Sequence, residues 1–272
     1  MKDKTTLELM NDPKISVIIP TQNRTHLLPE IIDCFNQQTW WNKELLILDN
    51  TRNGKEAIEQ LQKQYPNILL WHIEEMCSIG SKRNQLIQKA SGELIAHFDD
   101  DDYYAPSYIE NLVKVLINSS SDLVKLSAWF CLHESSKTLG YWDTMREDLP
   151  HTIFSGEEKL TTFPYKFNKK KYMSMTIGYG FSYIFKRRIW EATKFDDISL
   201  GEDSTFFIKI LEKKAIIKTV KDDKGICLHI VHSNNTSRCF PNFLIPNWLA
   251  PESLAKAIQW SDFQRVLLHH KG

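Results

Sequence analysis

Four consecutive aspartates, Asp99 to Asp102, are the residues of this chain whose type and spacing point most directly to chemistry. They follow an apolar stretch, residues 94–98, and precede two tyrosines. Four adjacent like charges repel one another, so at the end of a strand they cost stability unless a cation binds there. Carboxylate oxygens suit Mg²⁺ and Mn²⁺, and such ions often bridge carboxylates to phosphate oxygens. The run therefore predicts a divalent-cation site and a phosphate-bearing substrate.

The first half of the chain must position this run, and it alternates short apolar segments with helical patterns. Such alternation is typical of βαβ units and a mostly parallel sheet. We expect Pro20 to stop the first strand and Thr25 to be the N-cap of the helix after it. The expected strands are residues 15–19, 45–48, 68–73 and 94–98. Ligands of open α/β sheets bind at the carboxyl ends of strands, so the loops 21–24, 49–53 and 99–102 should meet.

The second half is less regular. A helix is expected over residues 108–118 and an apolar strand over 123–130, after which residues 131–175 lose the βα rhythm and resemble a substrate-specific insert. Order returns with a strand at 181–185, an amphipathic helix that opens at 200–203, and apolar runs at 215–220 and 226–231. Three prolines prevent the tail from forming one long helix, so it either packs on the core or contacts a membrane interface.

Composition narrows the possible partners. The 34 basic and 34 acidic residues balance, which argues against a nucleic-acid binder with a broad positive face. Five scattered cysteines without C-x-x-C spacing indicate reduced thiols rather than a disulfide framework. We find no apolar run near the ~18 residues that span a bilayer and no signal peptide, so the expected location is cytoplasmic.

Five segments in a fixed order carry a resemblance to a known family. They are ISVIIPTQNR (15–24), ELLILDN (44–50), GSKRN (80–84), SGELIAHFD (91–99) and GED (201–203). Together they closely resemble the family 2 glycosyltransferases over residues 14–235. The resemblance implies an α/β GT-A fold with a Rossmann-like, mostly parallel sheet. It also implies one domain over 1–235, with a nucleotide-sugar half (14–130) and an acceptor half (131–235), followed by a tail at 236–272.

In that family a D-x-D element holds Mn²⁺ or Mg²⁺, which binds the diphosphate of a nucleotide-sugar donor. The match makes Asp101 the expected direct metal ligand, with Asp99 sharing the ion or contacting the ribose and Asp100 and Asp102 in supporting positions. Relatives often carry a histidine near a short Asn-Thr element, so His232, or alternatively His229, is a candidate ligand. The plainer interpretation of the run is a solvated acidic turn.

The resemblance also places residues around the donor. The matching donor-side positions are Pro20, Thr21, Asn23, Arg24, Asp49, Arg83, Asn84, Asp99 and Asp100. Asp49 matches the acidic residue that reads the nucleobase, often uracil. The usual second acidic position is Asn50, so a UDP-sugar is favoured only weakly. Lys82, Arg83 and Asn84 begin a helix, where basic groups and free amides favour an anion, although solvated helix-end charges are the alternative.

Glu202 and Asp203 resemble the E-D motif of the family, whose aspartate acts as catalytic base. Inverting transfer needs one carboxylate that removes the acceptor hydroxyl proton, and we assign this role to Asp203. A structural charge at a helix start is the alternative. The segment 178–180 resembles the small-residue element that gives sugar and acceptor room. Trp142, Tyr165 and Tyr179 could stack on sugar rings or belong to the core.

The expected activity is transfer of one sugar from a nucleoside diphosphate to a hydroxyl of a saccharide or glycolipid acceptor. Family analogy suggests surface polysaccharide or lipooligosaccharide synthesis, with possible peripheral contact at the inner face of a membrane through the tail. Two alternatives stay open: a nucleotidyltransferase of sugar phosphates, and a non-catalytic relative that binds nucleotides or carbohydrates. The first is disfavoured because the loop after the first strand has no glycine, and the second because both acidic motifs are present.

Overall fold

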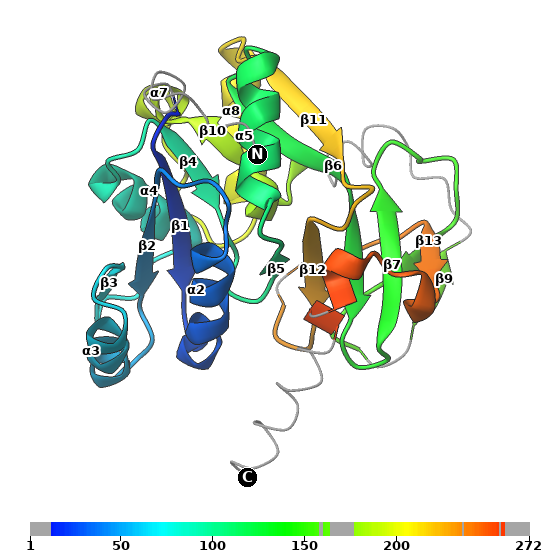
Figure 1. Ribbon diagram of the computed structural model, residues 1–272, viewed down its shortest axis with the longest axis horizontal. Coiled ribbons are helices and arrows are strands. Elements are labelled where there is room, and N and C mark those ends of the chain that lie inside the picture. Colours follow the sequence, from blue (N-terminus) through cyan, green and yellow to red (C-terminus); the bar gives the residue numbers. More distant parts are fainter. Residues whose placement is uncertain (1–11, 158–159, 164–176, 236, 256, 259–272) are drawn as a thin grey trace, which may run out of the picture.

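The chain folds around one large mixed sheet with helices on both faces (Figure 1). The computed structural model describes residues 12–157, 160–163, 177–235, 237–255 and 257–258. The strands of the first half are β1 (Ile15–Thr21), β2 (Lys43–Asp49), β3 (Leu69–His72), β4 (Leu94–His97) and β5 (Tyr103–Tyr104). The helices between them and just after them are α2 (Leu28–Asn36), α3 (Lys55–Gln64), α4 (Ile79–Lys89) and α5 (Tyr108–Asn118).

The second half adds longer strands and two helices. Its strands are β6 (Leu123–His133), β7 (Thr138–Asp143), β8 (His151–Ile153), β9 (Thr161–Phe163), β10 (Ile184–Lys186), β11 (Ile217–Lys221), β12 (Cys227–Val231) and β13 (Phe243–Ile245). Its α-helices are α7 (Arg187–Ala192) and α8 (Glu202–Glu212). Short 3₁₀ turns are η1 (Thr25–Leu27), η2 (Gly180–Ser182) and η3 (Asn247–Leu249).

The sheet is parallel where the βαβ units were expected. Its main path runs β13-β7-β6-β10-β4-β1-β2-β3, and β1 pairs in parallel with both β2 and β4. Strand β10 is antiparallel to β4 and to β6, which marks the change to the mixed half. The α/β class and the mostly parallel first half are therefore confirmed, and the strand ends that carry Thr21, Asp49 and the aspartate run lie at one edge of the sheet.

Two hydrophobic clusters, one on each face, hold the helices to this sheet. Alternation along β1 sends Val17 and Ile19 into the cluster that includes side chains of α2, α3 and α5, and Ile18 into the cluster with α4, α7 and α8. Successive strand residues point to opposite faces, so a strand covered on both faces reads as a continuous apolar run. This explains why ISVII folds as an inner strand rather than as an edge.

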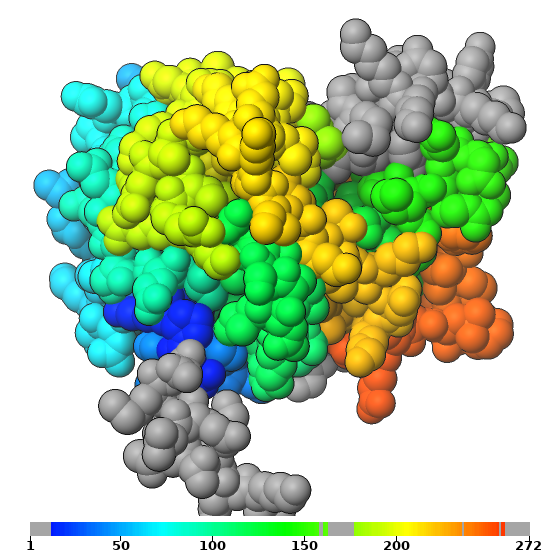
Figure 2. Space-filling model, turned by 90° about the horizontal axis from the view of Figure 1, so that it is seen from above, coloured from blue at the N-terminus to red at the C-terminus, as the bar shows by residue number. Residues whose placement is uncertain are grey.

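Strand β6 joins the two halves. All eleven of its residues are buried, and it pairs with β7, β10, β11 and β12 along its length. In the C-terminal segment β13 pairs with β7, and Leu254 and Ala257 are buried against Leu228 and Ile230 of β12. Seen from above, this orange segment lies at the opposite side of the molecule from the cyan first units (Figure 2). The proposed boundaries of the two halves and the tail stay predictions.

Three local expectations were wrong. Strand β1 continues through Pro20 to Thr21, because its parallel pairing with β2 extends to Asp49. Proline has no backbone N–H to donate, and the end of a strand tolerates this. Thr25 does not cap α2; it begins η1, and the residue before α2 is Leu27, which makes no side-chain cap. Residues 181–185 are not one strand, since η2 covers Gly180–Ser182 and only Ile184–Lys186 pair in β10.

Candidate active site

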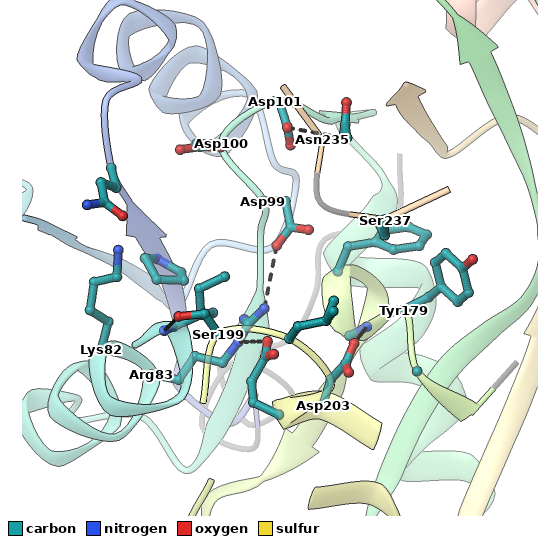
Figure 3. A pocket seen from close by; sticks show the side chains of 18 of the residues that line it. Lys82, Arg83, Asp99, Asp100, Asp101, Tyr179, Ser199, Asp203, Asn235 and Ser237 are labelled. Atoms are coloured by element: carbon teal, nitrogen blue, oxygen red, sulfur yellow. Dashed lines mark hydrogen bonds and ion pairs between the residues drawn. The ribbon is translucent and has the colours of Figure 1, made fainter. Parts of the chain in front are cut away.

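A cavity of about 700 Å³ lies at the carboxyl edge of the parallel strands. Its walls come from the loop after β1, the start of α4, the aspartate run, the segments 178–181 and 199–204, and the residues after β12. Of the predicted site residues, those that line it are Pro20, Asn23, Arg24, Arg83, Asp99, Asp100, Asp101, Glu202 and Asp203. Figure 3 shows the aspartates on one side of the cavity and Asp203 on the other, with Arg83 between them.

The members of the aspartate run point to different partners. Asp100 accepts hydrogen bonds from Thr21 Oγ1 (2.5 Å) and Arg24 Nη1 (2.8 Å). The Oδ2 of Asp101 accepts from Arg24 Nη1 at 2.7 Å. Asp102 accepts from the backbone N–H of Ile230 at 2.9 Å. The run is therefore divided, because Asp100 and Asp101 contact Arg24 of the loop after β1, whereas Asp102 contacts β12.

Three of the four carboxylates fit a divalent cation. One oxygen each from Asp99, Asp101 and Asp102 lie within 4.8 Å of one another. Burial and the neighbouring carboxylates raise the pKa of Asp99 to about 8. The pKa of Asp102 is raised too, chiefly by burial. The pKa of Asp101 is lowered instead, because the hydrogen bond to His232 and the charge of Arg24 outweigh its burial. Three carboxylate oxygens gathered this closely suit a hard cation.

Two histidines complete this corner. His232 Nε2 lies 3.0 Å from Asp101 Oδ2, and His232 Nδ1 accepts the N–H of Asn234 at 3.1 Å. His229 Nδ1 lies 2.8 Å from Asp102 Oδ2. Although burial opposes it, the Asp102 carboxylate raises the pKa of His229 to about 10. The structure thus brings both candidate histidines to the aspartates: His232 contacts the carboxylate of Asp101 and His229 that of Asp102.

Arginine and lysine side chains line the floor of the cavity. Arg83 is buried, with Nη2 3.7 Å from Asp99 Oδ1 and Nε 3.4 Å from Glu202 Oε1. Its Nη1 has no hydrogen-bond partner among the described residues. Lys82 Nζ donates to Thr21 O and Asn50 Oδ1, both at 2.9 Å. An arginine with an unused buried donor beside a cavity suits an anionic ligand.

Across the cavity, Asp203 is held by backbone groups rather than by charges. Its Oδ2 accepts the N–H of Gly180 at 2.7 Å, and its Oδ1 accepts the N–H of Ser204 at 2.6 Å. Tyr179 adopts a left-handed conformation (φ 62°), and a Cβ on Gly180 would lie 2.7 Å from Asp203 Cβ. A glycine at 180 therefore lets the backbone approach and fix the carboxylate.

Other predicted site residues lie away from the cavity wall. Asp49 is fully buried and bonded to Thr51 and to His72 Nδ1 at 2.8 Å. Asn84 Nδ2 donates to Phe195 O at 2.9 Å, so the side chain joins α4 to the segment after α7. Successive helix residues turn by about 100°, which separates Asn84 from Arg83. The structure does not bring these two side chains to the cavity.

Trp142 belongs to an aromatic cluster of the core. It is 1% exposed and packs edge-to-face against Trp129, Tyr179 and Phe240. Tyr179 lies at the border, because it contacts this cluster and also lines the cavity. Tyr165, the third residue expected to stack on sugar rings or to belong to the core, lies outside the described residues.

Sequence reasoning missed two features of the site. It gave Asp102 only a supporting place, whereas the structure puts an Asp102 oxygen in the same cluster as those of Asp99 and Asp101. It also overlooked Lys125, a buried lysine of β6 whose Nζ donates to Gly178 O at 2.7 Å, beside Asp203. A lysine within the apolar run LVKLSAWF was the signal that could have found it.

Comparison with known proteins agrees with the fold. The mannosyltransferase PcManGT from Pyrobaculum calidifontis, in complex with GDP-Man and Mn²⁺, matches 80% of this chain and 56% of its own, at 18% identity and a TM-score of 0.56. TarS 1–349 from S. aureus, in complex with UDP-GlcNAc, matches 82% of this chain and 60% of its own, at 17% identity and a TM-score of 0.57. These similarities confirm the GT-A fold.

The family follows from the sequence. The model of glycosyl transferase family 2 matches residues 16–191, well over half of the chain, so the protein belongs to that family. A Campylobacter jejuni relative, GalNAc(5)-diNAcBac-PP-undecaprenol beta-1,3-glucosyltransferase, is 26% identical over 75% of this chain and 61% of its own length. The chain spans less than half the length of most of the curated relatives that it matches.

Among the residues that the structure describes, every helix is too short or too polar to cross a bilayer.

Proposed function

We propose that this chain catalyses metal-dependent, inverting transfer of a sugar from a nucleoside diphosphate to a hydroxyl group. One observation carries the proposal: a three-carboxylate cluster and a separately held carboxylate, Asp203, face each other across a single cavity. Sugar transfer needs both parts, since one binds the leaving diphosphate and the other removes a proton. Family membership supports the same reaction class.

The aspartate corner is proposed to bind Mn²⁺ or Mg²⁺. Asp101 and Asp99 would hold the ion, with Asp102 beside them and His232 as a further candidate ligand. The ion would stabilise the negative charge that builds on the diphosphate as it leaves. Arg24 Nη1 contacts Asp101 at 2.7 Å, so its guanidinium lies beside the proposed ion, where it would also bind phosphate oxygens of the donor.

The floor of the cavity is proposed to bind the donor. Arg83 presents its unused Nη1, and Lys82 and Asn23 line the wall nearby. Asn50 would stand behind this wall, because Lys82 Nζ bonds to its Oδ1. The nucleobase stays open between uridine and guanosine: the titles of the two structural neighbours name UDP-GlcNAc and GDP-Man. The weak preference for a UDP-sugar came from Asp49 and was weakened by Asn50; because Asp49 lies away from the cavity wall, that preference still rests on the sequence alone.

Asp203 is proposed as the base. In the step, the acceptor oxygen forms a bond to the anomeric carbon while the bond from that carbon to the diphosphate oxygen breaks. The hydroxyl proton passes to the Asp203 carboxylate, and the nucleoside diphosphate carries away the bonding electron pair. Arg83 links the two corners, because it contacts both Asp99 and Glu202, the neighbour of Asp203.

The acceptor is proposed to be a saccharide hydroxyl, carried on a glycolipid. The name of the C. jejuni relative specifies an undecaprenol-linked saccharide. Residues 239–251 of this chain carry no charge, and they include the exposed Phe243, Leu244, Trp248 and Leu249, which suit peripheral contact with the inner face of a membrane. Co-sedimentation with lipid vesicles tests this contact, and a chain that stays in the supernatant contradicts it.

Thermal unfolding with a panel of nucleotide sugars, with and without Mn²⁺, tests the donor proposal. A donor that binds only the native state raises the free energy of unfolding, by about 2.7 kcal/mol at a hundredfold excess over its Kd, and the unfolding temperature rises with it. We expect one nucleotide sugar to stabilise the chain in the presence of Mn²⁺ and to do so less without it. No shift with UDP- or GDP-sugars would contradict the proposal.

Product analysis then separates the reaction classes. Sugar transfer releases a nucleoside diphosphate, whereas a nucleotidyltransferase acting on a sugar phosphate and a nucleoside triphosphate releases pyrophosphate. A purely binding relative releases neither. With the stabilising donor and saccharide acceptors we expect nucleoside diphosphate, and pyrophosphate from triphosphate substrates would overturn the assignment.

A further inference from the structure

A lysine stands in the middle of the buried strand that joins the two halves of the sheet. Lys125 is only 3% exposed, and its neighbours along β6 are Val124 and Leu126, both fully buried. Burying an ammonium group costs free energy unless hydrogen bonds or opposite charges compensate. Its position therefore calls for a reason beyond packing, because methionine would fill a similar volume at lower cost.

The contacts of Lys125 lead to one loop. Its Nζ donates to Gly178 O at 2.7 Å and approaches Ile177 O at 3.4 Å. It also lies over the rings of Tyr183 and Phe207, at 5.6 and 5.7 Å from their centroids. Burial lowers the pKa of Lys125 to about 7, and the nearby Asp203 carboxylate opposes this shift.

Gly180, two residues after Gly178 in the same loop, holds Asp203. The N–H of Gly180 donates to Asp203 Oδ2 at 2.7 Å, and a Cβ on Gly178 would lie 2.7 Å from Ser204 Oγ. Tyr183 fixes the loop from another side, since its hydroxyl donates to Ile177 O at 2.6 Å. The chain of contacts thus runs from Lys125 through the carbonyls of 177 and 178 and the amide of 180 to the carboxylate.

We propose that Lys125 is a positioning residue: by binding the carbonyls of Ile177 and Gly178 it holds the amide of Gly180 against Asp203 and fixes the direction of that carboxylate. The inference rests on the proposed role of Asp203 as base. Proton removal requires the carboxylate within hydrogen-bond reach of the acceptor hydroxyl, and a displacement of about 1 Å can cost 10²-fold in rate.

The test replaces the charge and keeps the volume. In Lys125→Met we expect kcat for sugar transfer to fall about 10- to 100-fold while the Kd for nucleoside diphosphate with Mn²⁺ stays within about twofold, because Lys125 does not line the cavity. The unfolding temperature should stay the same or rise, since the desolvation cost is removed. A lysine needed only for packing would instead lower stability and leave kcat unchanged.

Lys43 offers a matched control. It begins β2, at the end of the strand far from the cavity, and its Nζ also donates to backbone carbonyls, those of Gln38 and of Asn36 at the end of α2. It also lies over an aromatic ring, that of Phe35, at 5.1 Å from the centroid. Lys43→Met should therefore remove a similar set of contacts and leave kcat within about twofold of the wild type.

A double variant decides whether Lys125 acts through Asp203. We expect Lys125→Met to lower transfer in the wild-type background and to add no further loss to Asp203→Asn, because the base is then already absent. The proposal would be overturned if the losses of Lys125→Met and Asp203→Asn multiplied in the double variant. It would also be overturned if Lys125→Met left kcat unchanged or lowered donor affinity as much as kcat. Failure of the proposed function shows differently: Asp203→Asn would then keep full turnover by itself.

A second variant keeps the test decisive if Lys125→Met does not fold. Tyr183→Phe removes only the hydroxyl that bonds to Ile177 O. We expect a smaller fall in kcat, about three- to tenfold, with unchanged donor affinity and no effect in the Asp203→Asn background. A Tyr183→Phe variant with wild-type kcat would show that the loop does not need these ties, and it would overturn the proposal.

Discussion

Two acidic corners face each other across the cavity, and they are built in opposite ways. The aspartate corner gathers like charges: Asp99, Asp101 and Asp102 lie together, balanced by Arg24 and two histidines. Glu202 and Asp203 both line the cavity at the Asp203 corner, and the Asp203 carboxylate accepts from two backbone amides, those of Gly180 and Ser204. The first arrangement concentrates carboxylates that a cation would stabilise, whereas the second fixes the direction of one carboxylate through neutral donors.

This difference suggests a division of labour. Crowded carboxylates suit a metal ion, which relieves their repulsion. A single carboxylate fixed by neutral donors can accept a proton from a substrate and return to its starting state. Arg83 contacts Asp99 and Glu202, so it connects the two corners while the cavity separates their functions.

The largest predicted effect comes from the Asp203 corner. Asp203→Asn keeps the hydrogen-bonding shape of the side chain but cannot take up the acceptor proton. General base catalysis contributes about 10² to 10⁴-fold, so we expect kcat to fall about 10³-fold while the affinity for donor and Mn²⁺ is retained. Steady-state transfer assays combined with calorimetric binding check both parts. Turnover close to that of the wild type would remove Asp203 as the base.

A substitution in the aspartate corner should instead weaken the binding of metal and nucleoside diphosphate. Asp101→Asn removes a charge that contacts Arg24 and His232 and supplies one oxygen of the cluster. We expect Mn²⁺-dependent binding of nucleoside diphosphate to weaken by at least about tenfold, roughly 1.4 kcal/mol, measured by calorimetry. Equal affinities with and without Mn²⁺ in wild type and variant would contradict the metal assignment.

The raised pKa of Asp99 makes metal binding depend on pH. With its pKa at about 8, Asp99 is mostly protonated at pH 6, and a carboxyl group must lose its proton to bind a cation. Mn²⁺ affinity should therefore rise from pH 6 to pH 8, with proton release seen by calorimetry in buffers of different ionisation enthalpy. Asp99→Asn should lose most of this rise; identical Mn²⁺ affinities at both pH values in the wild type would contradict the account.

The smallest effect on function is expected outside both corners. Asn84 bonds to Phe195 and Trp190 rather than facing the cavity. Asn84→Ala should lower the free energy of unfolding by about 1–3 kcal/mol, seen in chemical denaturation, and leave donor affinity unchanged. Weaker donor binding in a variant that remains folded would show that Asn84 does take part in donor binding.

The sequence predicted the first half of the fold well and the second half less well. Continuous apolar runs such as 15–19 and 45–48 identify inner parallel strands, because such strands are buried on both faces. The short strand β10 and the turn η2 were misjudged as one strand, since the left-handed Tyr179 and the close contact of Gly180 with Asp203 depend on residues distant in the sequence. Local patterns do not contain that contact.

Within the site, sequence reasoning correctly joined the loop 21–24 to the aspartate run, but it also placed the loop 49–53 there, whereas Asp49 lies away from the cavity wall. It could not assign each side chain. Adjacent aspartates look alike in a sequence, yet the structure turns Asp100 toward Thr21 and brings Asp102 into the cluster. Lys125 was hidden because its role depends on a loop more than fifty residues away. Such pairings are set by the mixed half of the sheet, whose register the sequence does not show.

Locating Mn²⁺ by its anomalous X-ray scattering, in crystals grown with Mn²⁺ and a nucleoside diphosphate, tests the division of labour most directly. The account predicts one ion bonded to carboxylate oxygens of Asp101 and Asp99, with the diphosphate between the ion and Arg83 and with Asp203 free of the metal across the cavity. An ion bonded to Asp203 or Glu202, or a diphosphate bound with no ion at the aspartates, would contradict it.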